Sequence, residues 1–271
     1  MKYETLHNLS IPKIGFGCWT IGGEGAANPA DDERSLAALR SAVELGYRHF
    51  DTAEYYAAGH SEELLGQVVR ESGRTREDFF ITSKVSPEHL AYEDVLRSCA
   101  ASLARLGLAY LDLYLIHWPV RGMNLPETFR ALNRLVSEGR VRALGVSNFN
   151  LKLLKEAEAL SATPLLTNQA PYSIPDRRYV ENGVLAYCQS NDILLTAYSP
   201  VKSRFFKGKK LAEFARQKGS TPFQVGLAWL ARQPRVIAIP TSFNPQHQAE
   251  NLSAADLELR QAEMDFLDSL A

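Results

Sequence analysis

The chain has 271 residues, with 30 lysines and arginines against 31 aspartates and glutamates, and 45% of its residues are hydrophobic. This balanced charge gives no reason to expect nucleic acid or an acidic membrane surface as a partner. The three cysteines, Cys18, Cys99 and Cys188, are too widely spaced for a disulfide framework or a CxxC metal site, and they favour a reducing, cytoplasmic setting. The N-terminal residues lack the apolar core of a signal peptide, and no stretch approaches the roughly 18 apolar residues of a membrane span.

Short apolar runs alternate with amphipathic helical patterns along the chain. Residues 3–14 indicate a hairpin that caps the floor of a barrel. Strands are expected at 14–17, up to Asp51, up to Lys84, and at 111–116, 141–146, 164–169, 193–198 and 236–240. Helices are expected after each strand: from 32 to Gly46, from 61 to Gly73, around 95–106, near 127–135, at 151–160, around 184–187, near 211, from 221, from 244, and a last one ending near 270.

Eight strand-then-helix units predict a single-domain (β/α)8 barrel (a TIM barrel) over residues 1–271, with an N-terminal β-hairpin and additional C-terminal helices. A doubly wound open sheet is the main competing architecture. The sequence shows no linker, low-complexity run or repeat that would support a second domain.

Reactive side chains stand at the ends of three successive predicted strands. Asp51, Lys84 and His117 occupy these positions, and Tyr56 follows Asp51 by five residues. The carboxyl ends of parallel barrel strands meet on one face, so these side chains predict one active site. Taken singly, Asp51 reads as a cap or ion-pair partner, Lys84 as a solvated residue, and Tyr56 and His117 as packing residues. The combination favours catalysis.

A phenol has an unperturbed pKa of roughly 10, and a nearby cation would make Tyr56 a useful proton donor by stabilising its phenolate. Lys84 could supply that charge, Asp51 could hold the ammonium, and His117 could orient a substrate oxygen. The four residues suit delivery of a proton to a carbonyl oxygen that is becoming an alkoxide. None of them is a hydride source, so a cofactor is required.

Four motifs make the sequence similar to the aldo-keto reductase family along nearly its whole length. They are GYRHFDTA at 46–53, LYLIHWP at 113–119, GVSNF at 145–149 and AYSP at 197–200. The resemblance implies a barrel enzyme that reduces aldehydes and ketones with NAD(P)H. It makes Asp51, Tyr56, Lys84 and His117 the catalytic tetrad, with Tyr56 as general acid. Tyr55 is a rival by position, and residues 57–60 make the following loop longer than in the commonest signature.

The resemblance also implies a cofactor site, in which Trp19 and Thr20 take part. Ser147, Asn148 and Gln169 would hold the nicotinamide carboxamide, Tyr198 would stack on the ring, and Ser199 and Val201 would lie along the pyrophosphate. Ser242, Glu250 and Asn251 would serve the adenosine end. Thr241 and His247 stand where the family often has a basic residue and an arginine, which leaves the choice between NADPH and NADH open. The chain has no GxGxxG fingerprint and no metal motif.

Trp19, Tyr55 and Trp118 are candidates for an aromatic substrate wall. The short segment after His117 predicts an open cleft that accepts small carbonyl compounds. The partners expected are therefore small molecules, and the protein is expected to be a monomer. Two alternatives remain: a cofactor-sensing regulatory protein on the same fold, and a barrel that isomerises or hydrolyses sugars. The latter needs paired carboxylates, for which only Asp51 is well placed, with Glu54 a distant second.

Overall fold

The computed structural model describes residues 2–270. A two-stranded antiparallel hairpin, β1 (Tyr3–Leu6) and β2 (Leu9–Pro12), precedes an eight-stranded parallel sheet whose neighbouring strands follow one another in chain order. The sheet strands are β3 (Phe16–Gly17), β4 (His49–Asp51), β5 (Phe80–Val85), β6 (Leu111–Ile116), β7 (Val141–Ser147), β8 (Leu165–Pro171), β9 (Leu194–Tyr198) and β10 (Val236–Ala238).

The parallel sheet closes on itself. The amide of Gly15 donates to the carbonyl oxygen of Ala238 at 2.8 Å, and the amide of Gly17 donates to that of Pro240 at 3.1 Å. These bonds join the first strand of the sheet to the last. The structure therefore confirms the predicted closed barrel over an open doubly wound sheet.

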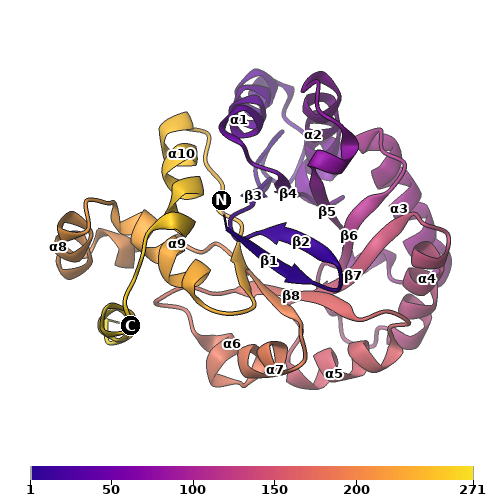
Figure 1. The fold of residues 1–271 in the computed structure, drawn as a ribbon. Helices are drawn as coiled ribbons and strands as arrows, with labels where there is room; N and C mark the ends of the chain where they lie inside the picture. Colours follow the sequence, from indigo (N-terminus) through magenta and orange to yellow (C-terminus); the bar gives the residue numbers. More distant parts are fainter. Residues whose placement is uncertain (1, 271) are drawn as a thin grey trace.

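Helices surround the barrel (Figure 1). They are α1 (Asp32–Leu45), α2 (His60–Glu71), α3 (Tyr92–Leu106), α4 (Leu125–Ser137), α5 (Leu151–Leu160), α6 (Arg178–Glu181), α7 (Val184–Ser190), α8 (Lys209–Gln217), α9 (Pro222–Arg232), α10 (Pro245–Ser253) and α11 (Gln261–Asp268). The predicted helices are present, and the short helix α6 and a 3-10 turn at Arg204–Lys207 were not predicted. No helix within residues 2–270 is long and apolar enough to cross a membrane.

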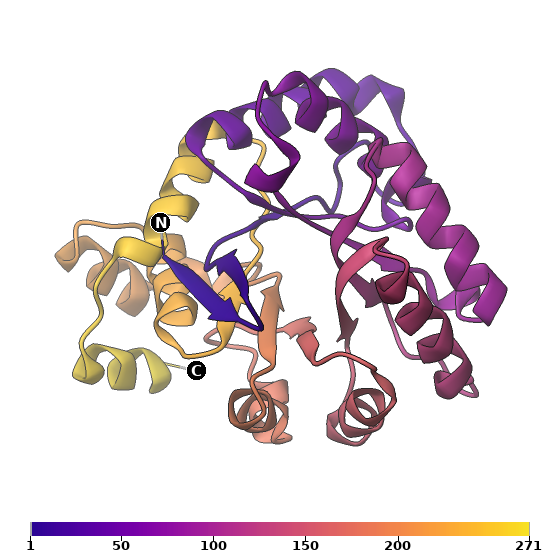
Figure 2. The same cartoon turned by 45° about the vertical axis from the view of Figure 1, so that its right-hand side comes forward.

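Successive side chains along a strand point alternately into the barrel and out toward the helices, which gives the protein two hydrophobic cores. On β6, Leu113 and Leu115 pack inside the barrel, whereas Tyr114 and Ile116 pack outward against the helices. The inner core also contains Leu6 and Ile11 of the hairpin, which lies across one end of the barrel in Figures 1 and 2. The hairpin thus closes the end where the strands begin and leaves the end where they finish for a site.

Candidate active site

The four strand-end side chains come together. Lys84 projects from β5 and donates hydrogen bonds to Asp51 Oδ1 at the end of β4, to the Thr52 carbonyl oxygen at 2.8 Å and to the Tyr56 hydroxyl oxygen at 3.0 Å. The His117 ring follows β6, and its centroid lies 5.5 Å from that of Tyr56. All four side chains are buried. The acid, amine, phenol and imidazole therefore lie close together, as the sequence predicted.

A left-handed turn sets Tyr56 in place. Ala57 and Ala58 have φ values of 49° and 54°, and Gly59 follows at 92°, just before α2 begins. Alanine rarely adopts this conformation because its Cβ approaches the backbone. The extra length noted in the sequence at 57–60 is thus taken up in a tight turn.

Opposing effects act on Lys84 and Tyr56. Burial disfavours the charged lysine, but the charge of Asp51 and its hydrogen bond hold the pKa of Lys84 above its ordinary value. Burial also raises the pKa of Tyr56, and it outweighs the lowering by the Lys84 charge. Lys84 therefore carries its charge and Tyr56 keeps its proton across the ordinary pH range.

His117 is a neutral imidazole. Burial, assisted by the charge of Lys84, lowers the pKa of His117 to about 2. Its Nδ1 is buried with no hydrogen-bond partner among residues 2–270. A buried N–H without an acceptor is rarer in proteins than an unpaired acceptor, so the proton belongs on Nε2. His117 lines the cavity described next, where an Nε2 proton is available to an oxygen atom.

A cavity of about 550 Å³ opens above these residues. It is lined by most of the residues predicted to bind cofactor or substrate: Trp19, Thr20, Trp118, Ser147, Asn148, Gln169, Tyr198, Ser199, Val201 and Thr241, together with Asp51, Tyr56 and His117. Lys84 lies beneath the cavity and reaches it through Asp51 and Tyr56. A cavity of this size, with apolar walls and a few convergent polar groups, suits a cofactor and a small ligand.

The residues predicted to hold a carboxamide form one hydrogen-bonded cluster. Asn148 donates through Nδ2 to Ser147 Oγ at 3.0 Å, and Ser147 Oγ donates to the Gln169 carbonyl oxygen at 2.9 Å. The Tyr198 hydroxyl donates to Asn148 Oδ1 at 2.9 Å, and Gln169 Nε2 donates to Asp51 Oδ2 at 2.7 Å. The cluster therefore connects the predicted cofactor residues directly to the Asp51–Lys84 pair.

The residues predicted at the adenosine end are more dispersed. The Thr241 hydroxyl lies in the cavity wall and donates to the Gly17 carbonyl oxygen at 2.6 Å. Ser242 lines a neighbouring hollow. Glu250 accepts a hydrogen bond from Gln246, and neither it nor Asn251 nor His247 lines these hollows.

The predicted aromatic wall is partly in place. Trp118 stacks on His117 with centroids 3.7 Å apart, and the Trp19 ring meets Tyr56 edge-on at 5.0 Å. Tyr55 packs edge-on against Trp118 at 5.7 Å but is 44% exposed, at the rim. Glu54 accepts a hydrogen bond from the Ser86 amide at 2.6 Å and does not line the cavity. The site thus lacks the Asp51–Glu54 carboxylate pair that a sugar-processing barrel would need.

Sequence reasoning missed part of the cavity lining. Glu24, Pro200, Ile239, Pro240 and Phe243 also line the cavity. The strand-end argument that selected Asp51 applies equally to Ile239 and Pro240, which directly follow β10. No comparable local signal marks Glu24, which lies in the first loop over the site.

A closed parallel barrel with a buried acid–amine–phenol cluster at the strand ends defines the class of barrel oxidoreductases suggested by the sequence motifs. The model of the aldo/keto reductase family matches residues 13–271. The chain belongs to this family of NAD(P)H-dependent enzymes, which reduce carbonyl compounds.

Three relatives illustrate the match. Glyoxal reductase of Bacillus subtilis (strain 168) is 35% identical over 98% of this chain and 91% of its own length. The crystal structure of a thermostable aldo-keto reductase, Tm1743, with the inhibitor epalrestat has a TM-score of 0.96 and 43% identity, and covers 100% of both chains. An aldo/keto reductase from Klebsiella pneumoniae, in complex with NADP and acetate, has a TM-score of 0.89 at 34% identity, covering 98% of this chain and 93% of its own.

Proposed function

We propose that the protein reduces small aldehydes and ketones, with Tyr56 as the proton donor and Lys84, Asp51 and His117 as its supporting residues. The observation that carries this proposal is the Lys84 ammonium, which lies 3.0 Å from the Tyr56 hydroxyl oxygen and also donates to Asp51. A fixed cation stabilises the phenolate that remains after the proton leaves, so it lowers the cost of the transfer. Tyr55, which makes no such contact and is largely exposed, is the weaker candidate.

His117 would orient the substrate. Its neutral ring, held against Trp118, presents the Nε2 proton to the carbonyl oxygen that also receives the Tyr56 proton. Two donors aimed at one oxygen fix the carbonyl and favour the developing alkoxide over the ground state. The nicotinamide cofactor supplies the hydride when it is bound.

The residues present fit such a cofactor. Ser147, Asn148 and Gln169 offer amide and hydroxyl groups at one end of the cavity, and Tyr198 adds an aromatic face beside them. Gln169 also touches Asp51, so a ligand held by this cluster is positioned over the reacting groups. A monomer is proposed as the functional unit, because the reacting groups and most of the predicted cofactor residues line one cavity.

The test starts with NADPH and NADH titrated separately into purified protein, with tryptophan fluorescence as the readout. Glyoxal, methylglyoxal, larger aldehydes, ketones and aldoses are then added to each complex, and cofactor oxidation is followed. The proposal predicts binding and turnover, with small aldehydes among the best substrates, as the name of the Bacillus subtilis relative suggests. Binding without turnover across the panel would instead indicate a regulatory protein, and a specific activity that rises with protein concentration would contradict a monomer.

A further inference from the structure

The cleft continues beyond the predicted cofactor residues toward α1. Thr20, Glu24 and Phe243 line both the main cavity and a second hollow of about 230 Å³. Phe243 and Arg34 line this second hollow and also a third, of about 510 Å³. The three spaces therefore share lining residues and lie next to one another, from the cavity that Tyr56 lines to the hollow beside Arg34 on α1.

Arg34 lines the two hollows that lie beyond the main cavity. Its guanidinium carbon lies 4.3 Å from the centroid of the Phe243 ring, and it forms no ion pair within residues 2–270. Stacking on an aromatic ring is a typical position for a guanidinium and leaves its edge donors free for a ligand. Arg34 is thus an exposed cation that is held in place but not neutralised.

The third hollow suits an anion. It is lined by Arg34, Ser242, Phe243, Asn244 and Pro245, and so contains one cation, one hydroxyl and no carboxylate. The second hollow is different, since Glu24 and Asp31 line it. An anion at the far end of the cleft would therefore lie on the Ser242 side of Arg34.

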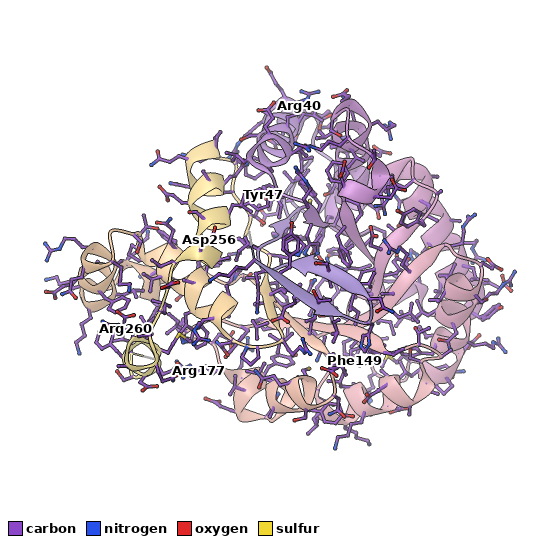
Figure 3. All side chains as sticks on the ribbon, viewed as in Figure 1. Arg40, Tyr47, Phe149, Arg177, Asp256 and Arg260 are labelled. Atoms are coloured by element: carbon purple, nitrogen blue, oxygen red, sulfur yellow. The ribbon has the colours of Figure 1, made fainter. Side chains whose placement is uncertain are left out.

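Buried contacts fix Arg34 relative to this loop. The fully buried Gln248 donates through Nε2 to the Ala38 carbonyl oxygen on α1, at 3.0 Å, and to the Ser242 carbonyl oxygen, at 2.8 Å. The hydroxyl of Tyr47, which is labelled in Figure 3, donates a hydrogen bond to the Gln248 carbonyl oxygen at 2.8 Å. The helix that carries Arg34 and the loop that carries Ser242 are therefore held together before any ligand arrives.

We propose that Arg34, together with Ser242, binds the 2′-phosphate of NADPH and makes the protein selective for NADPH over NADH. The inference rests on the proposed function, because it requires the cleft to bind a nicotinamide dinucleotide with its adenosine at this end. Arg34 then replaces, from a different element of the fold, the basic side chains that Thr241 and His247 do not provide. The planar guanidinium of Arg34 can donate two hydrogen bonds to one phosphate and also carries the opposite charge.

The matched comparison is Arg34→Gln against Arg40→Gln. Arg40 lies on the same helix (Figure 3), where it is exposed and pairs with Glu71 at 2.7 Å. It lines none of the three spaces. Both substitutions remove one positive charge from α1, but only Arg34→Gln removes it from the cleft. Arg34→Lys keeps the positive charge but replaces the planar guanidinium, which can donate two parallel hydrogen bonds to a phosphate, with an ammonium.

Dissociation constants for NADPH, NADH, 2′,5′-ADP and 5′-AMP are measured on each variant by fluorescence or calorimetry. Arg34→Gln is expected to weaken NADPH and 2′,5′-ADP about tenfold and to leave NADH and 5′-AMP within about twofold. Arg34→Lys should fall between, and Arg40→Gln should match the wild type. The selectivity of the wild type should also fall as salt is raised, and that of Arg34→Gln should change less.

Each contrary outcome has its own meaning. Equal weakening of NADPH and NADH by Arg34→Gln would overturn the inference and leave only a packing role against Phe243. Unchanged binding of both would overturn it outright while leaving the proposed reductase intact. Failure of the wild type to bind either dinucleotide would instead overturn the proposed function, and the inference with it.

Discussion

Lys84 and Tyr56 are joined by a 3.0 Å hydrogen bond although the first extends from a strand and the second stands on a turn 28 residues earlier in the chain. The same ammonium also donates to Asp51 and to the Thr52 carbonyl oxygen. Its donors are thus all directed to oxygen atoms, which fixes the ammonium at one point below the cavity. The position of the charge under the phenol is set by the fold and not by the substrate.

Tyr56→Phe should lower the rate of carbonyl reduction by about 10²- to 10⁴-fold, since it removes the proton donor and little volume. Binding of NADPH should remain close to that of the wild type. The matched control is Tyr55→Phe, which alters the neighbouring, exposed phenol and should retain most of the activity. Steady-state kinetics with one aldehyde on both variants decides the point, and the opposite ranking would assign the role to Tyr55.

Lys84→Met should destabilise the protein by about 3–5 kcal/mol, because it leaves the buried Asp51 carboxylate without its cation. Asp51→Asn in the same chain should recover part of this loss, since the amide that replaces the carboxylate carries no charge that needs a partner. The measurement is guanidinium unfolding of the wild type, both single variants and the double variant. Additive effects of the two substitutions would show that the pair is not coupled.

Acid should destabilise the fold through His49. Burial lowers the pKa of this imidazole to about 4, below the value of about 6.5 expected in the unfolded chain. Its contribution to stability is therefore complete above pH 6.5 and is lost as the pH falls toward 4. The loss between pH 7.5 and 5 should be about 2 kcal/mol.

His49→Gln tests this by removing the titrating group. Denaturant unfolding at pH 7.5 and 5 should show a smaller acid-induced loss in the variant than in the wild type. His7→Gln, at an exposed position, serves as the control and should keep the wild-type pH dependence. Equal losses in all three proteins would show that His49 is not the group responsible.

Gly66→Ala should lower stability, although alanine within a helix is ordinarily better than glycine by about 1 kcal/mol. A Cβ at Gly66 would lie 2.3 Å from the carbonyl oxygen of Leu106, a backbone atom at the end of α3. The resulting separation of α2 and α3 should cost about 1–3 kcal/mol. Thermal unfolding gives the answer, and Gln67→Ala, at the next position of α2, supplies the comparison without that clash.

The barrel and the residues at its strand ends could be predicted because both depend on local patterns. Alternation along a strand sends Lys84 inward with Phe80 and Thr82, and parallel strands bring their ends to one face. Arg34 could not be predicted in this way. The helical pattern of α1 indicates which side faces the core, but it does not indicate that a loop more than 200 residues later lies beside its first turn.

The same limit explains smaller differences. Glu54 directly precedes Tyr55 of the predicted aromatic wall, yet its carboxylate is held by the Ser86 amide and the His89 ring and does not line the cavity. The left-handed conformation of Ala57 and Ala58 could not be predicted from the sequence, because alanine ordinarily favours a right-handed helix. The position of Glu54 depends on contacts that form only after β4 and β5 have come together.

The hydrogen bonds that close the barrel have a consequence for synthesis of the protein. Thr241 and Gly17, which meet in the cavity wall, are separated by 224 positions, so this wall is absent from the nascent chain until β10 has left the ribosome. Contacts so distant in sequence form late, because ordering the intervening chain comes first. A ribosome-bound chain that has made β3 to β9 therefore has all four residues of its tetrad but no complete nucleotide cleft. Ligand binding can stabilise the finished barrel, but it cannot guide the assembly of its earlier strands.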